Sequence, residues 1–466
     1  MSTFRFFNHY IRVPYLLLGI VEAFIFYVSV YIAAYVRFAG IIEESETGLK
    51  GLERGALIYA IIMIITFIAM GLYQANQRDS LKVLILRIIT AYFFGLVGLS
   101  LLFYMMPNLY LGRGIIILSV IISFLILFIL RMSLLSFSGN TFKRRVLVLG
   151  TGDKALALSG LRRKSDRRGF ALLGYIHLRG TSDKVDKEKI ITLNMSLKDY
   201  CLANEVDEIV LAIDDRRKNY PIDELLDCKM SGIDITDMVT FFERETGKIK
   251  LDLLQPSWFI LGYGFRKTML DMVIKRVFDL VVSILLMILT LPIMLFTIIA
   301  IKVEDGLSAS FIYKQIRVGE DGKPYYVLKF RSMREGAEKA GKAKWADKND
   351  SRISKVGAFI RKTRIDELPQ LFNVIIGDMS FVGPRPERPE FVVKLSEKIP
   401  YYGERHRVKP GITGWAQICY PYGSSDKDAL EKLQYDLYYV KNYSLFIDIL
   451  IMLHTAEVII FGKGAR

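Results

Sequence analysis

Residues 366–386 read DELPQLFNVIIGDMSFVGPRP, which is the most informative stretch of the chain. It places two adjacent carboxylates, Asp366 and Glu367, upstream of Arg385, which lies between two prolines. A carboxylate can attack phosphorus or hold Mg²⁺, an arginine can contact two phosphate oxygens at once, and prolines stiffen a loop. An Asp-Glu pair alone is usually solvated surface charge. With its arginines and apolar surroundings, this pair predicts phosphate chemistry close to a membrane.

Further basic residues near the pair extend this prediction. Arg361 precedes Asp366 within the same stretch of chain and is close enough to reach the same phosphate. Lys329 and Arg331 alternate with apolar neighbours at a predicted strand, 325–330, and can also point at phosphate. The alternatives are an ordinary surface ion pair for each arginine and a solvated strand face for residues 329 and 331.

The composition indicates a membrane protein with water-facing parts. Of 466 residues, 52% are hydrophobic, and the mean hydropathy of +0.30 is too high for a soluble enzyme. The net charge of +15 fits both basic cytoplasmic loops and the binding of anionic phosphates. Nucleic acid binding is not expected, because the basic residues are spread among apolar segments. The three cysteines and four histidines are scattered, so they predict neither disulfides nor a zinc site, as in a reducing cytoplasm.

Four apolar segments are long enough to cross a bilayer, at about 14–36, 56–73, 83–106 and 114–131. The first is too long for the apolar part of a cleavable signal, and no small-residue cleavage site follows it. Lysine and arginine collect at the N-terminus, between the second and third segments and after the fourth, whereas the first loop is rich in glutamate. Positive charge marks the cytoplasmic side, so the sequence predicts four spans with both ends in the cytoplasm.

Residues 141–250 change to an α/β pattern. A buried strand pattern is followed by Gly150, Gly152 and a helical pattern, and further strands are predicted at 172–178 and 207–213. A strand, a glycine turn and a helix open a Rossmann-like unit, and alternating strands and helices imply a parallel sheet. No acidic residue ends the second strand to hold a ribose, so we expect a structural or oligomerising role, with nucleotide binding as the alternative.

The C-terminal part carries six sequence blocks in a fixed order. They are KRVFDL (275–280), YKQIRVG (313–319), KFRSM (329–333), RKTRIDELPQL (361–371), GDMSFVGPRPE (377–387) and KPGITGWAQ (409–417). In these blocks the chain resembles the bacterial sugar transferase family, the monotopic phosphoglycosyltransferases that move a sugar phosphate onto a polyprenyl phosphate. It departs from the family at Ala309-Ser310, where a Gly-Pro turn is usual, and this departure concerns the local turn rather than the chemistry.

The resemblance implies transfer of a hexose 1-phosphate from a UDP-sugar to undecaprenyl phosphate with release of UMP, the initiating step of exopolysaccharide or capsule synthesis. Glucose is the expected sugar, with galactose next. The resemblance also implies that Asp366 is the nucleophile and forms a covalent phosphosugar intermediate, and that Asp366 and Glu367 meet Mg²⁺. Arg361 and Arg385 are then phosphate-binding. We expect a homodimer in the bacterial inner membrane, with the catalytic domain in the cytoplasm.

A fifth apolar run, about 280–301, would carry the sugar-nucleotide site outside if it crossed the membrane. Pro292 lies near its middle, where it removes a backbone hydrogen bond and bends a helix. Lys275 and Arg276 precede the run and Lys302 follows it, so both ends favour the same leaflet. We therefore expect a re-entrant helix–break–helix that enters and leaves on the cytoplasmic face, as the resemblance also implies. A straight fifth span with a kink is the alternative.

Three further features of the C-terminal part are less specific. Trp415 and Gln417 can contact sugar or base, although a Trp packed after a glycine turn is the alternative. Residues 335–351 are rich in Lys, Gly and Asp and are predicted to be a mobile lid or a disordered excursion. The apolar segment 445–461 carries three ionisable residues, so we expect an amphipathic helix at the membrane interface or packed on the catalytic unit.

The predicted organisation is a four-helix transmembrane region (1–140), a Rossmann-like domain (141–250), a linker (251–271), and a re-entrant hairpin with an α/β catalytic domain (272–466). Two other functions compete with this interpretation. A membrane-anchored nucleotide-sugar oxidoreductase or epimerase needs a ribose-binding acid and a Tyr-x-x-x-Lys pair, whereas Tyr443 follows Tyr439 at that spacing. A non-catalytic membrane scaffold is disfavoured by the intact carboxylate pair and both arginines.

Overall fold

The chain folds into two compact units, Met1–Phe6 with Tyr10–Gly247 and Phe7–His9 with Lys248–Arg466. The computed structural model describes residues 3–6, 9–38, 52–73, 81–136, 143–159, 170–178, 183–214, 221–254, 258, 264–265, 267–334, 352–420, 423 and 425–460. Two short strands, β1 (Thr3–Phe6) and β2 (His9–Arg12), pair near the N-terminus.

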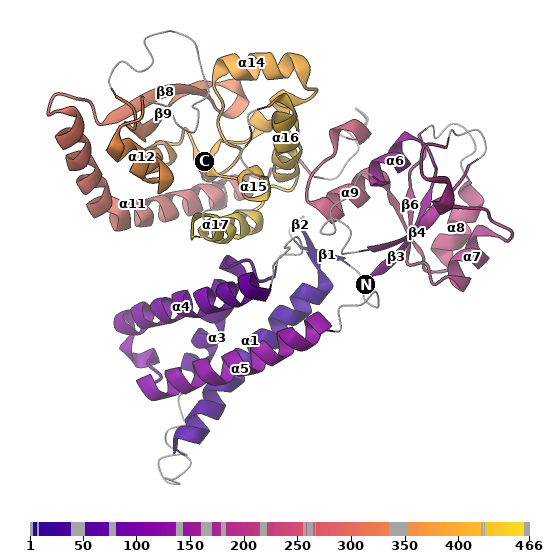
Figure 1. Ribbon diagram of the computed structural model, residues 1–466, viewed down its shortest axis with the longest axis horizontal. Coiled ribbons are helices and arrows are strands. Elements are labelled where there is room, and N and C mark those ends of the chain that lie inside the picture. Colours follow the sequence, from indigo (N-terminus) through magenta and orange to yellow (C-terminus); the bar gives the residue numbers. More distant parts are fainter. Residues whose placement is uncertain are drawn as a thin grey trace. The chain divides into compact units, whose positions relative to one another are not determined.

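The first unit contains a bundle of long helices (Figure 1). They are α1 (Val13–Phe38), α3 (Leu52–Ala69), α4 (Leu81–Met105) and α5 (Arg113–Ser136), with a 3₁₀ turn at Pro107–Leu109. Helix α1 packs against α3 and α5, and α3 packs against α4. Each of the four is long and apolar enough to cross a membrane, at the positions that the sequence predicts. The crossing itself, and the count of four spans, stay predictions.

The interior of the bundle combines aromatic rings with a buried ion pair. The rings of Phe26, Phe67 and Tyr92 meet edge to face, with centroids 5.1 to 6.2 Å apart. Arg131 of α5 donates to both carboxylate oxygens of Glu22 in α1, at 2.8 and 2.9 Å. An unpaired charge in apolar surroundings is costly, so Glu22 and Arg131 each stabilise the other. Because they lie on different helices, their ion pair joins α1 to α5.

The first unit also contains a five-stranded parallel sheet. Its strands are β3 (Arg144–Leu149), β4 (Phe170–Ile176), β5 (Ile190–Ile191), β6 (Glu208–Leu211) and β7 (Asp234–Asp237). Its helices are α6 (Asp153–Ser159), α7 (Leu197–Ala203), α8 (Ile222–Met230) and α9 (Met238–Thr246), with a 3₁₀ turn at Lys187–Lys189. The spatial order β5-β4-β3-β6-β7 is that of a Rossmann-type sheet, which confirms the predicted parallel α/β architecture. The sequence missed β5 and β7, because one has two residues and the other reads DITD.

The second unit begins with a 3₁₀ turn, η4 (Leu251–Leu253), and the long helix α11 (Met269–Asp305). A β8 (Ile312–Val318)–β9 (Pro324–Phe330) hairpin follows, with a 3₁₀ turn, Glu320–Gly322, between its strands. The other elements are α12 (Lys355–Lys362), η6 (Ile365–Glu367), α13 (Gln370–Ile376), β10 (Ser380–Val382), α14 (Pro389–Lys398), η7 (Tyr402–Arg407), β11 (Gly411–Thr413), α15 (Trp415–Cys419), α16 (Asp426–Lys441) and α17 (Leu445–Ile460). Strands β10 and β11 pair in parallel.

The core of the second unit draws on residues from most of its length. Buried side chains from α13, β10, α16 and α17 form one apolar cluster, which includes Leu371, Val382, Leu437 and Ile447. Ile249 belongs to the same cluster, and its amide donates to the carbonyl of a residue in α16. The second unit therefore begins slightly before the linker that the sequence predicts at 251.

Helix α11 is continuous over 37 residues, with Pro292 inside it, and Figure 1 shows it bending along its length. Its C-terminal half packs through Met294 and Ile301 against Phe330 of β9 and Ile360 of α12. Its N-terminal half also packs on the second unit, against α13 and β10. Both halves of α11 therefore contact the same unit. The side of α11 that faces away from the unit exposes large apolar side chains. By length and composition, this helix is also apolar enough to span a membrane. The predicted break is a bend within one helix, and the re-entrant course stays a prediction.

Helix α17 packs on the second unit, as one of the two predicted arrangements has it. Ile447 and Ile451 are fully buried in the core cluster. Asp448, His454 and Glu457 are also buried, so the ionisable residues of this segment face the protein. The buried positions of α17 recur every three to four residues, so one face of the helix packs on the unit, whereas Ile449 is 42% exposed.

Candidate active site

Asp366 and Glu367 lie on the 3₁₀ turn η6, between α12 and α13. Arg364, just before the turn, has a φ of +61°, a left-handed conformation that turns the chain sharply. Pro369 follows as the N-cap of α13. The side chain of Asp366 is buried. This local geometry directs two adjacent carboxylates inward instead of leaving them on a solvated helix face.

Glu367 is surrounded by cations. Its Oε1 accepts hydrogen bonds from Nζ of Lys329 at 2.9 Å and from Nη2 of Arg385 at 3.1 Å. Nη1 of Arg364 lies 3.9 Å from the same oxygen. Burial alone would raise the pKa of Glu367, but the three positive charges outweigh burial and hold the pKa well below its ordinary value. Glu367 is therefore a fixed anion that gathers three cationic side chains around one point.

Asp366 differs from its neighbour in electrostatics. Burial, and secondly the charge of Glu367, raise the pKa of Asp366 above its ordinary value, although Lys329 and two arginines oppose them. Two carboxylates whose environments push their pKa values apart are suited to different roles. Glu367 is committed to ionic contacts, whereas Asp366 is a more basic carboxylate that lines a pocket.

This pocket has a volume of about 830 Å³ and brings together most of the predicted site residues. Those that line it are Lys329, Arg331, Arg361, Asp366, Glu367, Arg385 and Gln417. Trp415 is not among the described residues that line the pocket, and its ring stacks on that of Tyr438 with centroids 5.8 Å apart. Its position matches the packed tryptophan that the sequence left as an alternative. The predicted lid, 335–351, lies outside the described residues.

One part of the pocket wall is weakly polar and comes from two apolar helices. Leu286 and Thr290 of α11 line it, as do Thr455 and Val458 of α17. Leu289, close to Leu286 on α11, exposes 72% of its surface. The same pocket therefore borders both a cluster of charged groups and an apolar helix, an arrangement that fits an amphipathic ligand with a phosphate at one end.

The bacterial sugar transferase family matches residues 270–462, which contain the whole carboxylate and arginine cluster. The chain is 36% identical to the UDP-glucose:undecaprenyl-phosphate glucose-1-phosphate transferase of Klebsiella pneumoniae, over 69% of each chain. The chain belongs to the bacterial sugar transferase family. As a member of this family, the protein is a phosphotransferase.

Two further relatives differ in the sugar that their names carry. The undecaprenyl-phosphate galactose phosphotransferase of Salmonella typhimurium is 30% identical over 70% of each chain. The UDP-N-acetylgalactosamine-undecaprenyl-phosphate N-acetylgalactosaminephosphotransferase of Aeromonas hydrophila is 40% identical over 51% of this chain, and the match spans only 55% of that relative. The family is thereby established, and the sugar is not.

The sequence missed several basic residues of this bacterial sugar transferase pocket. They are Arg317, Arg334, Arg352, Arg388, Arg405 and Lys432, together with Arg364, which the sequence shows just before the carboxylate pair without assigning it to the site. Arg317 and Arg364 lie inside two of the quoted sequence blocks, where a search for charges flanking the motif would find them. Arg405 and Lys432 lie outside the blocks, and only the packing of η7 and α16 brings them to the pocket.

The predicted metal is Mg²⁺, and the structure tests which residues fit it. The described residues include no group of three or more His, Cys, Asp or Glu side chains that could hold a metal. Mg²⁺ often uses only one or two protein carboxylates and completes its shell with water and substrate phosphates. Asp366 fits this role, whereas Oε1 of Glu367 already contacts Lys329 and Arg385. A metal here would be held by Asp366 together with phosphate oxygens of a substrate.

The glycine turn of the Rossmann-type sheet is filled by a side chain of the same domain. The carboxylate of Asp214, after β6, accepts hydrogen bonds from the backbone amides of Asp153 and Lys154 at 3.0 and 3.1 Å. A Cβ atom at Gly152 would collide with that carboxylate. In dinucleotide-binding sheets this place takes the pyrophosphate. Asp214 provides an internal anion there, which favours the structural role over cofactor binding.

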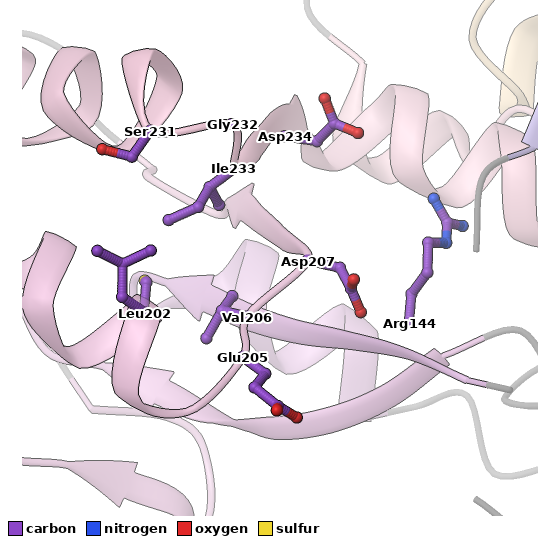
Figure 2. A pocket seen from close by; sticks show the side chains of 10 residues that line it. Arg144, Leu202, Glu205, Val206, Asp207, Ser231, Gly232, Ile233 and Asp234 are labelled. Carbon is purple, nitrogen blue, oxygen red and sulfur yellow. The ribbon is translucent and has the colours of Figure 1, made fainter. Parts of the chain in front are cut away.

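A separate pocket of about 310 Å³ lies at the opposite end of this sheet, where the strands begin (Figure 2). Residues that precede or begin β6 and β7 line it, among them Asp207 and Asp234, together with Arg144 at the start of β3. Arg144 forms ion pairs with Glu208 and Glu245, at 3.1 and 2.5 Å. Ligands of such sheets bind at the carboxyl ends of the strands, so this amino-end pocket does not correspond to a cofactor site.

Proposed function

We propose that the chain transfers a hexose 1-phosphate from a UDP-sugar to undecaprenyl phosphate and releases UMP. The observation that carries the proposal is the Asp366–Glu367 pair, which lines a pocket with basic side chains on one part of its wall and apolar helices on another. The names of the three relatives support it, because each is described as acting on undecaprenyl phosphate.

In the first step, a carboxylate oxygen of Asp366 attacks the β-phosphorus of the UDP-sugar. The bond between this phosphorus and the bridging oxygen breaks, UMP leaves with that oxygen, and the sugar phosphate remains on Asp366 as an acyl phosphate. Attack requires the ionised carboxylate. Burial and the charge of Glu367 raise the pKa of Asp366, and the cations of the pocket oppose them by favouring the ionised form.

In the second step, a phosphate oxygen of undecaprenyl phosphate attacks the same phosphorus. The bond to Asp366 breaks, the carboxylate is restored, and the sugar becomes linked to the lipid through a diphosphate. Division into two displacements lets UMP leave before the second anion reacts, so the two anionic substrates need not be held together.

The cations around Glu367 stabilise the charge that develops on the transferring phosphoryl group. Lys329 and Arg385 are held by Oε1 of Glu367 at 2.9 and 3.1 Å, so contacts within the protein already orient these cations and they need little reorganisation. Arg331 and Arg361 line the same pocket and are proposed to contact the remaining phosphate oxygens. Bound Mg²⁺, held by Asp366, would supply further charge neutralisation between carboxylate and diphosphate.

We further propose that α11 enters and leaves the membrane on one side. A straight helix of 37 residues would extend about 55 Å and carry one end away from the unit. Instead, both halves of α11 pack on the unit that holds the pocket. The pocket wall at Leu286 and Val458 is then the route for the polyprenyl chain. This arrangement supports a cytoplasmic catalytic unit on a bacterial inner membrane.

The sugar and the oligomeric state are finer proposals. Glucose remains the proposed hexose, and the glucose-specific name of the Klebsiella pneumoniae relative supports it, while the galactose and N-acetylgalactosamine names of the other relatives keep the choice open to test. A homodimer is proposed with the sheet domain of the first unit as its contact, because the filled glycine turn favours a structural role for that domain.

The test uses purified full-length protein with Mg²⁺, undecaprenyl phosphate and, separately, UDP-glucose, UDP-galactose and UDP-N-acetylgalactosamine. We expect release of UMP with at least one of them. Without lipid, wild type should release about one equivalent of UMP and carry sugar phosphate on Asp366, whereas Asp366→Asn should release none. Release of UDP instead of UMP, or a sugar phosphate mapped to another residue, would contradict the proposal.

A further inference from the structure

The loop that carries Arg385 has every backbone carbonyl from Pro384 to Glu387 engaged. Gly411 N donates to the carbonyl of Pro384 at 3.0 Å, and Nη2 of Arg405 donates to that of Arg385 at 2.9 Å. Nη1 of Arg317 donates to the carbonyl of Pro386 at 3.2 Å, and Val318 N donates to that of Glu387 at 3.0 Å. Two of the four donors are side chains. A loop whose consecutive carbonyls are all bonded is fixed in direction, and so is the arginine that it presents.

Arg405 is the more buried of the two side-chain donors, with 6% of its surface exposed. Its Nη2 donates to the carbonyl of Arg385 and lies 2.8 Å from Oδ2 of Asp436 in α16. Its Nη1 donates to the hydroxyl of Tyr402 at 2.7 Å. Asp436 and Tyr402 are themselves almost fully buried, with 1% and 2% exposed. One guanidinium therefore joins three elements: η7, α16 and the Arg385 loop.

These contacts form a continuous line to the carboxylate pair. Asp436 holds Arg405, Arg405 holds the main chain of Arg385, and Nη2 of Arg385 donates to Oε1 of Glu367 at 3.1 Å. Arg405, Asp436 and Tyr402 also line the pocket. A shift of the loop by a fraction of a hydrogen-bond length would move the Arg385 guanidinium relative to Glu367.

We infer that Arg405 and Asp436 are a positioning pair that fixes where Arg385 meets the transferring phosphoryl group. The inference rests on the proposed function. A buried ion pair is weak evidence for stability, because desolvation of two charges offsets their attraction. Its value here is geometric: a guanidinium offers several donors in a rigid plane, so one side chain can hold a carboxylate, a hydroxyl and a carbonyl at once.

The test compares Arg405→Lys, Asp436→Asn and Tyr402→Phe in full-length protein, with Asp426→Asn as the control. Asp426 lies on the same helix as Asp436 and pairs with Lys398 in an exposed contact, and neither residue is among the described residues that line the pocket. We expect Arg405→Lys and Asp436→Asn to lower kcat about 10²-fold, since misplacing a catalytic group by about 1 Å costs this much. Tyr402→Phe removes one of three contacts and should cost several-fold, while the control should match wild type.

A double-mutant cycle separates positioning from simple stability. Arg385→Ala should lower kcat by about 10²-fold to 10³-fold in the wild-type background. In the Asp436→Asn background the same change should cost less than about 10-fold, because Arg385 is already misplaced there. Each variant is also tested for thermal unfolding, so that loss of folded protein is counted separately.

The outcomes are distinguishable. Undiminished kcat in folded Asp436→Asn and Arg405→Lys, or fully additive effects with Arg385→Ala, would overturn the positioning role while leaving the proposed function intact. If those two variants fail to fold, Tyr402→Phe decides, and an unchanged kcat in that variant contradicts the inference. A wild type that releases no UMP from any UDP-sugar overturns the proposed function and the inference together.

Discussion

Nζ of Lys275 in α11 lies 2.6 Å from Oδ2 of Asp448 in α17, and both side chains are buried. The same ammonium donates to the carbonyl of Val382 at 3.2 Å, at the end of β10. The hydroxyl of Tyr439 lies 2.8 Å from Oδ1 of Asp448 and 3.0 Å from the carbonyl oxygen of Val382, so its one hydrogen is shared between these two acceptors. The apolar helix α11 is thus anchored, through a buried charge, to the strand that leads into the Arg385 loop.

Removal of this charge should destabilise the second unit. Lys275→Met leaves Asp448 and Asp279, which lies 3.7 Å from the ammonium, buried without that cation. We expect a loss of about 3 to 5 kcal/mol in the free energy of unfolding. Thermal and denaturant unfolding in detergent micelles measure it. The matched control is Lys398→Met, which breaks an exposed pair with Asp426 and should cost less than about 1 kcal/mol. Equal costs for the two variants would rule out an anchoring role for Lys275.

Glu367→Gln should separate turnover from binding. The substitution removes the anion that gathers Lys329, Arg364 and Arg385, so these cations lose their arrangement while the pocket becomes more positive. We expect kcat to fall about 10²-fold, while the KM for the UDP-sugar stays the same or decreases. Steady-state kinetics over a range of UDP-sugar concentrations checks both constants. A rise in KM with kcat unchanged would show that Glu367 serves ground-state binding only.

The course of α11 can be read from reporters of membrane sidedness. Gly322 lies in the turn of the β8–β9 hairpin, after α11, so a reporter fused there should be cytoplasmic, like one fused at Thr141. Pro292→Ala restores the backbone N–H that proline lacks and removes the ring clash, so the helix should straighten and part of the Gly322 reporter should move to the periplasm. Periplasmic labelling at Gly322 in the wild type would instead establish a fifth span.

Titration of Asp436 should make stability and activity change in opposite directions with pH. Burial, opposed by the charge of Arg405, raises the pKa of Asp436 from 3.8 to about 6. The folded state therefore binds a proton more readily than the unfolded state, and this group adds stability as the pH falls from about 6 toward 4. Protonation also removes the charge paired with Arg405, so activity should fall over the same range.

The variant Asp436→Asn isolates this effect from other titrating groups. The difference in unfolding free energy between wild type and Asp436→Asn should shift in favour of wild type as the pH is lowered from 7 to about 4.5. Parallel curves at all pH values would mean that Asp436 titrates in its ordinary range. Asp366 and Glu367 are present in both proteins and largely cancel in the comparison.

Asp214 gives a prediction for the sheet domain. Asp214→Ala leaves the amides of Asp153 and Lys154 without the carboxylate that they now contact. We expect a loss of about 1 kcal/mol or more in stability of the sheet domain, as for loss of a helix cap, with turnover unchanged. Hydrogen exchange at the two amides and UMP release provide the measurements. Recovery of lost activity by added NAD would show that this turn serves a cofactor.

The sequence was sufficient where function lies in contiguous residues. Asp366, Glu367 and Arg385 belong to two neighbouring blocks, and the structure places them together, with Nη2 of Arg385 3.1 Å from Oε1 of Glu367. The positions of the helices in the bundle followed from the lengths of the apolar runs, because a run of about 20 apolar residues is typical of a helix that is long enough to span a bilayer.

The sequence was insufficient where a contact joins distant segments that carry no pattern. Arg405 and Asp436 meet only because η7 packs on α16, and Asp214 reaches the glycine turn from the end of a different strand. Trp415 could be assigned to the pocket or the core from its motif, and only its stacking on Tyr438 decides for packing. Such contacts depend on the tertiary arrangement, which neither residue type nor spacing specifies.

The basic residues of the pocket also bear on how its substrates arrive. Eleven Lys and Arg side chains line the pocket against four Asp and Glu side chains, so positive charge is in excess by seven among the described residues. A cleft lined by one sign of charge raises the local concentration of ions of the opposite sign and speeds their association. The pocket therefore attracts anionic substrates before they make contact, and dissolved salt weakens this attraction by screening it.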